Sequence, residues 1–169
     1  MSIDLKDILR DIDKKDNVKT LMNIILTHYK SGNIVELEKM LEVVRNEVTY
    51  TLSDVEVFPD KEIEYLDKAL KLLTIYLTIL ALIIKIRNIT ILSNVESLEN
   101  YVLECNLSET VNLSMHLVQN YINGNHEILR KISEKISKID IKMGVKPFEK
   151  CSWIMKRIIN NLIDLLTQL

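Results

Sequence analysis

Glycine and proline are scarce in this chain of 169 residues, which has three glycines and two prolines. β-Sandwiches, β-barrels and glycine-rich nucleotide-binding folds need turn residues at regular intervals, so this scarcity excludes them. Gly32, Gly124 and Gly144 are also too far apart to form a phosphate-binding loop. With 47% hydrophobic and 27% charged residues, the composition instead indicates an all-α fold with enough apolar residues for a core.

Clusters of metal ligands and nucleophiles are also missing. Cys105 and Cys151 do not form a Cys-x-x-Cys pair, and His126-Glu127 lacks the second histidine of a zinc hydrolase motif. Cys105 and His116 could meet in space as nucleophile and base, but an ordinary buried thiol is the expectation. We therefore predict no catalytic residues, no metal and no cofactor, and a protein that is not an enzyme.

The sequence shows neither a secretion signal nor a long hydrophobic run. Acids and bases alternate through residues 1–16 without the apolar segment of a signal peptide. The uncharged stretch Leu72–Ile84 has thirteen residues, whereas a bilayer span needs about twenty. We expect a cytoplasmic protein with no membrane segment, in which this stretch is a central buried helix. The presence of only two glutamines also favours a thermophilic source.

Hydrophobic spacing and capping residues predict about eight helices joined by short links. They cover about 5–12, 18–31, 34–48, 59–87, 93–106, 108–122, 125–143 and 147–169. Ser93, in Ser93-x-x-Glu96, and Ser108 are the expected caps of two helices, and Pro147 is the expected start of the last. Thr49–Phe58 is rich in β-branched and aromatic residues but has no partner strand, so we expect a loop there.

A short segment of the sequence occurs twice. Tyr29–Glu42 and Tyr121–Glu134 share tyrosine, glycine, asparagine, leucine, lysine and glutamate at a constant offset of 92 residues. A chain that reverses between two helices needs a residue that tolerates positive φ, followed by a capping side chain. We therefore expect a helical hairpin at each copy. The turn residues are Tyr29, Gly32, Asn33, Tyr121, Gly124 and Asn125.

The first copy resembles the middle of a tetratricopeptide repeat, in which an aromatic residue ends one helix and glycine makes the turn. Leu37 and Leu129 stand where alanine is usual, and the copies are 92 rather than about 34 residues apart. The resemblance therefore implies tetratricopeptide-like hairpins and not a regular array.

A second resemblance covers more of the chain. The segments that carry it are Leu98–Cys105, Thr110–Asn112, Leu117-Val118, Gly124 and Leu129. They resemble a small crenarchaeal family of unknown function with a tetratricopeptide-like fold. This resemblance implies an archaeal protein and an α-α superhelix, and the length of the chain favours a single helical-repeat domain over residues 1–169.

Charge is distributed unevenly along the chain. The net charge is −2, to which residues 1–127 contribute −7 and residues 128–169 contribute +5. The lysines after Asn125 follow helical spacing and share one face, which would suit an anionic ligand, although a solvated surface is the simpler interpretation. This basic face consists of Arg130, Lys131, Lys135, Lys138 and Lys142.

Two functions are compatible with these features. The favoured one is a non-catalytic adaptor or scaffold that binds a protein partner between helical hairpins. The alternative is a nucleic-acid-associated accessory subunit that uses the basic face against phosphates. The apolar face of the last helix, with Ile158, Leu162 and Leu165, is wide enough for a homodimer contact or for closing the superhelix.

Overall fold

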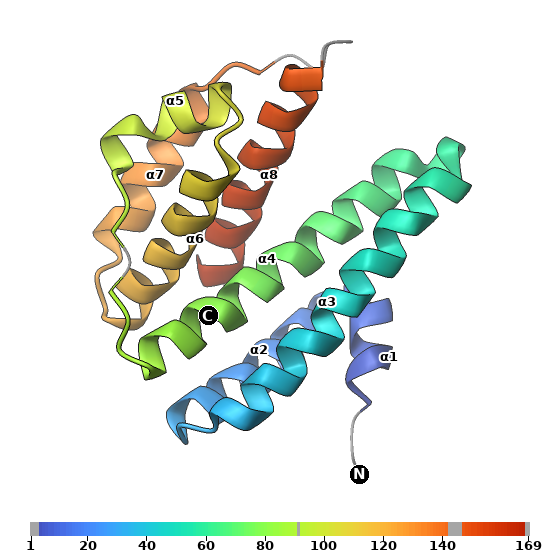
Figure 1. The fold of residues 1–169 in the computed structure, drawn as a ribbon, viewed down its shortest axis with the longest axis vertical. Coiled ribbons are helices and arrows are strands. Elements are labelled where there is room, and N and C mark those ends of the chain that lie inside the picture. The colour runs from blue at the N-terminus through green and yellow to red at the C-terminus, as the bar shows by residue number, and fades with distance from the viewer. Residues whose placement is uncertain (1–3, 91, 142–146, 168–169) are drawn as a thin grey trace. The chain divides into compact units, whose positions relative to one another are not determined.

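The computed structural model describes residues 4–90, 92–141 and 147–167. Eight α-helices and two short 3₁₀ helices occur in these ranges, without any strand (Figure 1), which confirms the all-α fold. Their contacts group into two compact units, Met1–Asn88 and Ile89–Leu169. The superhelical arrangement and the single domain stay predictions.

The first unit is built around a long helical hairpin. Its helices are α1 (Leu5–Arg10), α2 (Lys15–Lys30), α3 (Ile34–Val57) and α4 (Glu62–Ile86), with a 3₁₀ turn at Pro59–Lys61. α3 and α4 pack along each other, α2 packs against both, and α1 contacts α2 and α3 (Figure 1). Pro59 occupies the start of the 3₁₀ turn, where its fixed φ suits a helical beginning.

The segment from Thr49 to Val57 is helical, so the expected loop over Thr49–Phe58 is wrong. Local propensity favours extended backbone here, but α4 packs along α3, and tertiary packing outweighs propensity. The hydroxyl groups are satisfied within the helix. Thr49, Thr51 and Ser53 each donate to the carbonyl oxygen four residues earlier, at 3.1, 2.8 and 3.1 Å.

α4 is strongly apolar, and much of it is buried. Leu72, Ile75 and Ile79 are at most 2% exposed, and the buried Thr74 and Thr78 donate their hydroxyl protons to carbonyl oxygens one turn earlier. By length and composition alone, the segment Pro59–Ile86 could cross a membrane. However, 61% of its most apolar 18-residue window is buried inside the protein, which is also how a core helix behaves.

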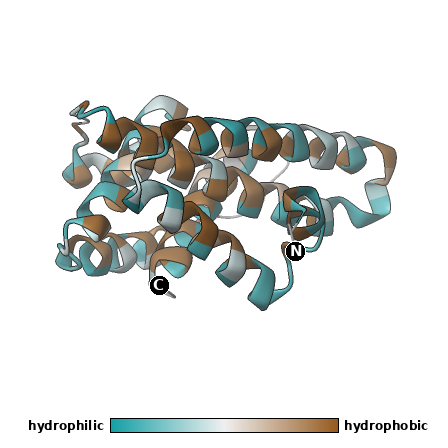
Figure 2. Ribbon diagram, turned by 90° about the horizontal axis from the view of Figure 1, so that it is seen from below, coloured by the Kyte–Doolittle hydropathy of each residue, from teal (hydrophilic) through white to brown (hydrophobic). Residues whose placement is uncertain are grey.

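The second unit packs three helices against a fourth. After a 3₁₀ turn at Val95–Ser97 come α5 (Leu98–Leu103), α6 (Leu107–Ile122), α7 (Glu127–Lys138) and α8 (Pro147–Thr167). α8 contacts the other three (Figure 1), and apolar residues recur along the long helices (Figure 2), which gives each of them a face for the core. α8 begins at Pro147, as predicted. Gly144, the expected end of the helix before it, lies outside the described residues.

Two of the predicted helix caps are wrong. Asn94, not Ser93, caps the 3₁₀ turn, because its side-chain oxygen accepts from a backbone amide at 3.0 Å. Ser93 Oγ is buried and has no hydrogen-bond partner among the described residues. Asn106, not Ser108, caps α6 by the same kind of bond, at 3.2 Å. Asparagine caps a helix as well as serine does, so the sequence alone does not show which of two nearby residues is the cap.

Candidate functional site

The two hairpin turns expected from the repeat share one backbone structure. Gly32 and Gly124 adopt left-handed φ angles of +67° and +83°. The amides of Asn33 and Asn125 each donate, at 2.9 Å, to the carbonyl oxygen five residues earlier. This is the Schellman arrangement, which satisfies the last carbonyl groups of a helix and reverses the chain.

A third turn of this kind joins α5 to α6, and the sequence pattern does not single it out. Cys105 stands in the place of glycine, with φ of +57°, and the Asn106 amide donates to the Tyr101 oxygen at 2.8 Å. A shared signal could have found it. Asn33-x-x-Glu36 and Asn106-x-x-Glu109 both place an asparagine cap three residues before a glutamate.

Tyr121, one of the predicted turn residues near α7, borders a groove in the second unit. Tyr121 and His126 stack with ring centroids 4.8 Å apart, and the Asn125 side chain donates to Asn120 at 3.1 Å. The groove has a volume of about 600 Å³, and the end of α8 lines its other side. Burial raises the pKa of Tyr29, the matching residue of the first turn.

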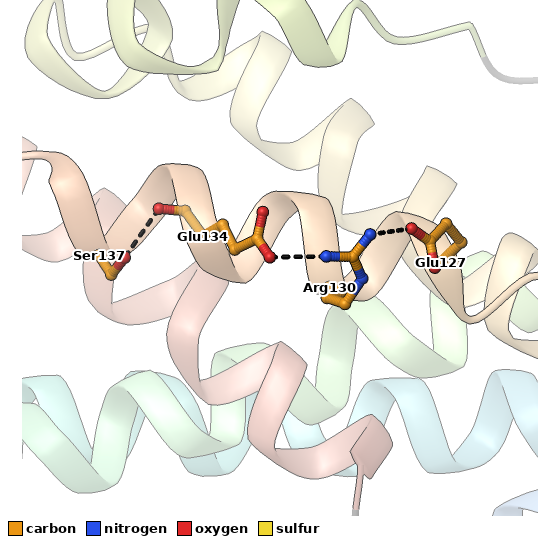
Figure 3. A network of polar contacts seen from close by, with 4 residues as sticks. All are labelled: Glu127, Arg130, Glu134 and Ser137. Atoms are coloured by element: carbon orange, nitrogen blue, oxygen red, sulfur yellow. Dashed lines mark hydrogen bonds and ion pairs between the residues drawn. The ribbon is translucent and has the colours of Figure 1, made fainter.

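Much of the predicted basic face is neutralised by its own neighbours. Arg130 pairs with Glu127 and, at 2.8 Å, with Glu134, all on α7 (Figure 3). The hydrogen bond from Arg130 holds the pKa of Glu127 below its usual range. Lys135 reaches Glu96 Oε2 at 3.2 Å. Exposed pairs of this kind contribute little to stability, but they compete with any anionic ligand.

The rest of the basic face offers few free cations. Lys131 and Lys138 are exposed and form no ion pair within the ranges that the structure describes. α7 ends at Lys138, and Lys142 lies outside the described residues. Among the described residues of the basic face, Lys131 and Lys138 are thus the two lysines left to contact a phosphate.

The two cysteines lie together in the second unit. Cys105 Sγ is 3.5 Å from Ser152 Oγ, and the Cys151 thiol is hydrogen-bonded to Cys105. Burial, with this hydrogen bond, raises the pKa of Cys151 to about 11. The His116 ring contacts the Asn120 amide at 3.1 Å, and burial lowers the pKa of His116. In the described part of the chain, no three His, Cys, Asp or Glu side chains could hold a metal ion.

The apolar face of the last helix is already used. Ile158, Leu162 and Leu165 are 1%, 0% and 8% exposed. α8 packs on α5, α6 and α7 with this face. These three residues are therefore too buried to contact a second chain. The homodimer through the C-terminal helix stays a prediction.

Four large apolar side chains are exposed near the end of the α3–α4 hairpin. Val57, Phe58 and Ile63 are 65%, 44% and 68% exposed, and Leu52 is 46% exposed. We call these four residues the hairpin tip. These exposed residues could not be identified from the sequence, because a loop is expected over Thr49–Phe58. A loop has no regular face on which apolar residues recur.

Acidic side chains dominate the chain around the hairpin tip. Residues 54–64 contain one basic residue, Lys61, and these acids: Asp54, Glu56, Asp60, Glu62 and Glu64. Glu62 and Glu64 lie in the first turn of α4, where the helix dipole favours negative charge. The hairpin tip thus consists of exposed apolar side chains that alternate with acidic residues along this part of the chain.

Comparisons with known proteins give no relative: no protein-family model, curated protein or solved structure matches this chain.

Proposed function

We propose that this protein is a non-catalytic adaptor or scaffold that binds a protein partner through the hairpin tip. The observation that carries the proposal is the exposure of Val57 and Ile63, at 65% and 68%. Valine and isoleucine are among the residues that proteins bury most often, and a group of exposed apolar side chains marks an interaction surface.

The acidic surround of the hairpin tip defines the chemistry of the partner. A segment with apolar side chains flanked by lysine or arginine would cover Val57 and Ile63 and face the carboxylates around them. The apolar contact would supply affinity, and the opposite charges would speed association and fix the orientation. Added salt would then slow association without abolishing binding.

Tetratricopeptide-like hairpins are the proposed architecture of this scaffold. The shared turn structure at Gly32, Cys105 and Gly124 supports it, because stacked helical hairpins need repeated reversals of the chain. An α-α superhelix, as in the crenarchaeal family that the sequence resembles, and a cytoplasmic location belong to the same proposal.

A comparison of three tagged chains tests the function. These are the unaltered chain, a Val57→Ser/Ile63→Ser variant, and a Val35→Ser control. Val35 is 61% exposed on the same helix α3 but lies outside the hairpin tip. Each is purified from the native host or a close relative, with and without nuclease and high salt, and bound proteins are identified by mass spectrometry. We expect a protein that the unaltered chain and the control retain and the double variant loses.

Two results would overturn the proposal. Equal retention of the same proteins by all three chains would show that the hairpin tip is not the binding surface. Loss of all bound material with nuclease would favour the nucleic-acid-associated subunit, and Lys131→Gln with Lys138→Gln would then be the next variants.

A further inference from the structure

A polar pocket lies in the first unit between α1, α3 and α4. Its volume is about 430 Å³, within the range of small-molecule sites. None of the hairpin-tip residues lines it. Its charged lining residues are Lys6, Arg10, Glu47, Asp54 and Lys68.

Glu47 and Asp54 form the acidic wall of this pocket. They are seven residues, or about two turns, apart on α3 and therefore share a face. Glu47 is only 9% exposed, although carboxylates are rarely buried without a partner. No hydrogen bond or ion pair joins the Glu47 carboxylate to another described residue, and the adjacent Thr51 hydroxyl donates to the backbone oxygen of Glu47 instead, at 2.8 Å.

Lys6 and Arg10, one turn apart on α1, and Lys68 on α4 form the basic wall. Lys68 is half-buried, and within the described ranges neither Lys68 nor Lys6 has an ion pair. Arg10 makes one long, exposed contact, 3.9 Å from Asp7 Oδ1. Opposite charges thus face the same space from different helices without closing on each other.

We propose that this pocket binds a small zwitterionic ligand, in which an amine and a carboxylate or phosphate are joined by a short chain. The amine would pair with Glu47 and Asp54, and the anionic group would pair with Lys6, Arg10 and Lys68. A ligand with one sign of charge would leave one wall without a counter-charge.

Calorimetry on the full chain tests this with defined probes. The zwitterions are 4-aminobutanoate and 6-aminohexanoate, and hexanoate and hexylamine are matched compounds that each carry a single charge. We expect at least one zwitterion to bind, and each compound with a single charge to bind at least about tenfold more weakly. The absence of binding by both zwitterions up to about 10 mM, or equal binding by hexanoate, would overturn the proposal.

Variants then assign the two walls. Glu47→Gln and Lys68→Gln should each weaken binding of the zwitterion about tenfold, because each removes the charge of one wall. Glu42→Gln is the matched control, since Glu42 is exposed on α3 and does not line the pocket. If Glu47→Gln does not fold, the Lys68→Gln variant by itself tests the proposal. Unchanged affinity in the folded variants would show that the zwitterion does not bind between the two walls and would overturn the proposal.

Discussion

At the scale of single residues, positive φ angles shape the ends of the helices. Asn88 and Cys105 adopt φ angles of +59° and +57°, in addition to Gly32 and Gly124. Glycine reaches this region without steric cost, whereas a residue with a Cβ atom loses about 1–2 kcal/mol there. In a chain with so few glycines, the two at helix ends therefore occupy positions where the backbone needs them.

Gly32→Ala and Gly124→Ala should each lower the free energy of unfolding by about 1 kcal/mol. An added Cβ atom would meet no other atom within 4 Å at either site, so the cost comes from the backbone conformation alone. Urea unfolding measures it. Lys19→Ala, at an exposed position of α2, is the control and should change stability by less than about 0.5 kcal/mol. Equal stability of all four chains would contradict this account of the turns.

The Cys151 thiol should react slowly at pH 8. Its pKa, raised to about 11 by burial and by its hydrogen bond to Cys105, leaves little thiolate at that pH, and the thiolate is the reactive form. Iodoacetamide labelling followed by peptide mapping should therefore be at least about tenfold slower for Cys151 in the folded chain than in urea. The folded rate should rise as the pH approaches 11. Identical labelling rates of Cys151 in the folded chain and in urea would contradict the raised pKa.

At the scale of helices, capping side chains mark the start of some elements, whereas α2, α4 and α7 begin without one. Asn33 and Asn106 accept hydrogen bonds from backbone amides at 3.3 and 3.2 Å, and both start long helices. Neighbouring serines look equivalent in sequence. Their different roles follow from where the preceding turn places the backbone, since a cap must be the residue that immediately precedes the helix.

Asn106→Ala should destabilise the protein by about 1 kcal/mol, whereas Ser108→Ala should change stability by less than about 0.5 kcal/mol. Asn106 supplies the cap of α6, and Ser108 is exposed within the helix. Chemical unfolding of both variants measures the difference. A larger loss of stability in Ser108→Ala than in Asn106→Ala would show that Ser108 is the cap, as the sequence pattern predicts.

At the scale of the whole molecule, the division after Asn88 separates two sets of packed helices. The described residues between α4 and the turn at Val95 form no helix, and Leu92 is 83% exposed. An exposed, irregular segment between compact units is where proteases cut first.

Limited thermolysin digestion should first cut next to Leu92 and give two fragments of about half the chain each, because this protease cleaves beside large apolar residues and needs accessible backbone. Mass spectrometry locates the cut. Leu92→Asp should slow it without lowering the melting temperature. First cuts inside α3 or α4 would contradict the division into units.

The sequence by itself determined the fold class and several helix ends. Few glycines and prolines, with apolar residues at helical spacing, suffice for an all-α chain, and Pro59 and Pro147 mark helix starts because proline fixes φ and lacks an amide proton. Such signals are local, so they can be interpreted without knowing what the helix packs against.

Only the tertiary structure decided the rest. It made Thr49–Val57 helical because α4 lies along that segment, and it thereby created the hairpin tip. It brought Glu47 opposite Lys6 and Lys68, and Cys105 beside Ser152, from distant parts of the chain. It also paired Lys135 with Glu96 and so reduced the basic face, whereas the pairing of Arg130 with Glu134 is local to α7. Long-range packing and charge pairing depend on which helices meet, and periodicity along one helix carries no information about that.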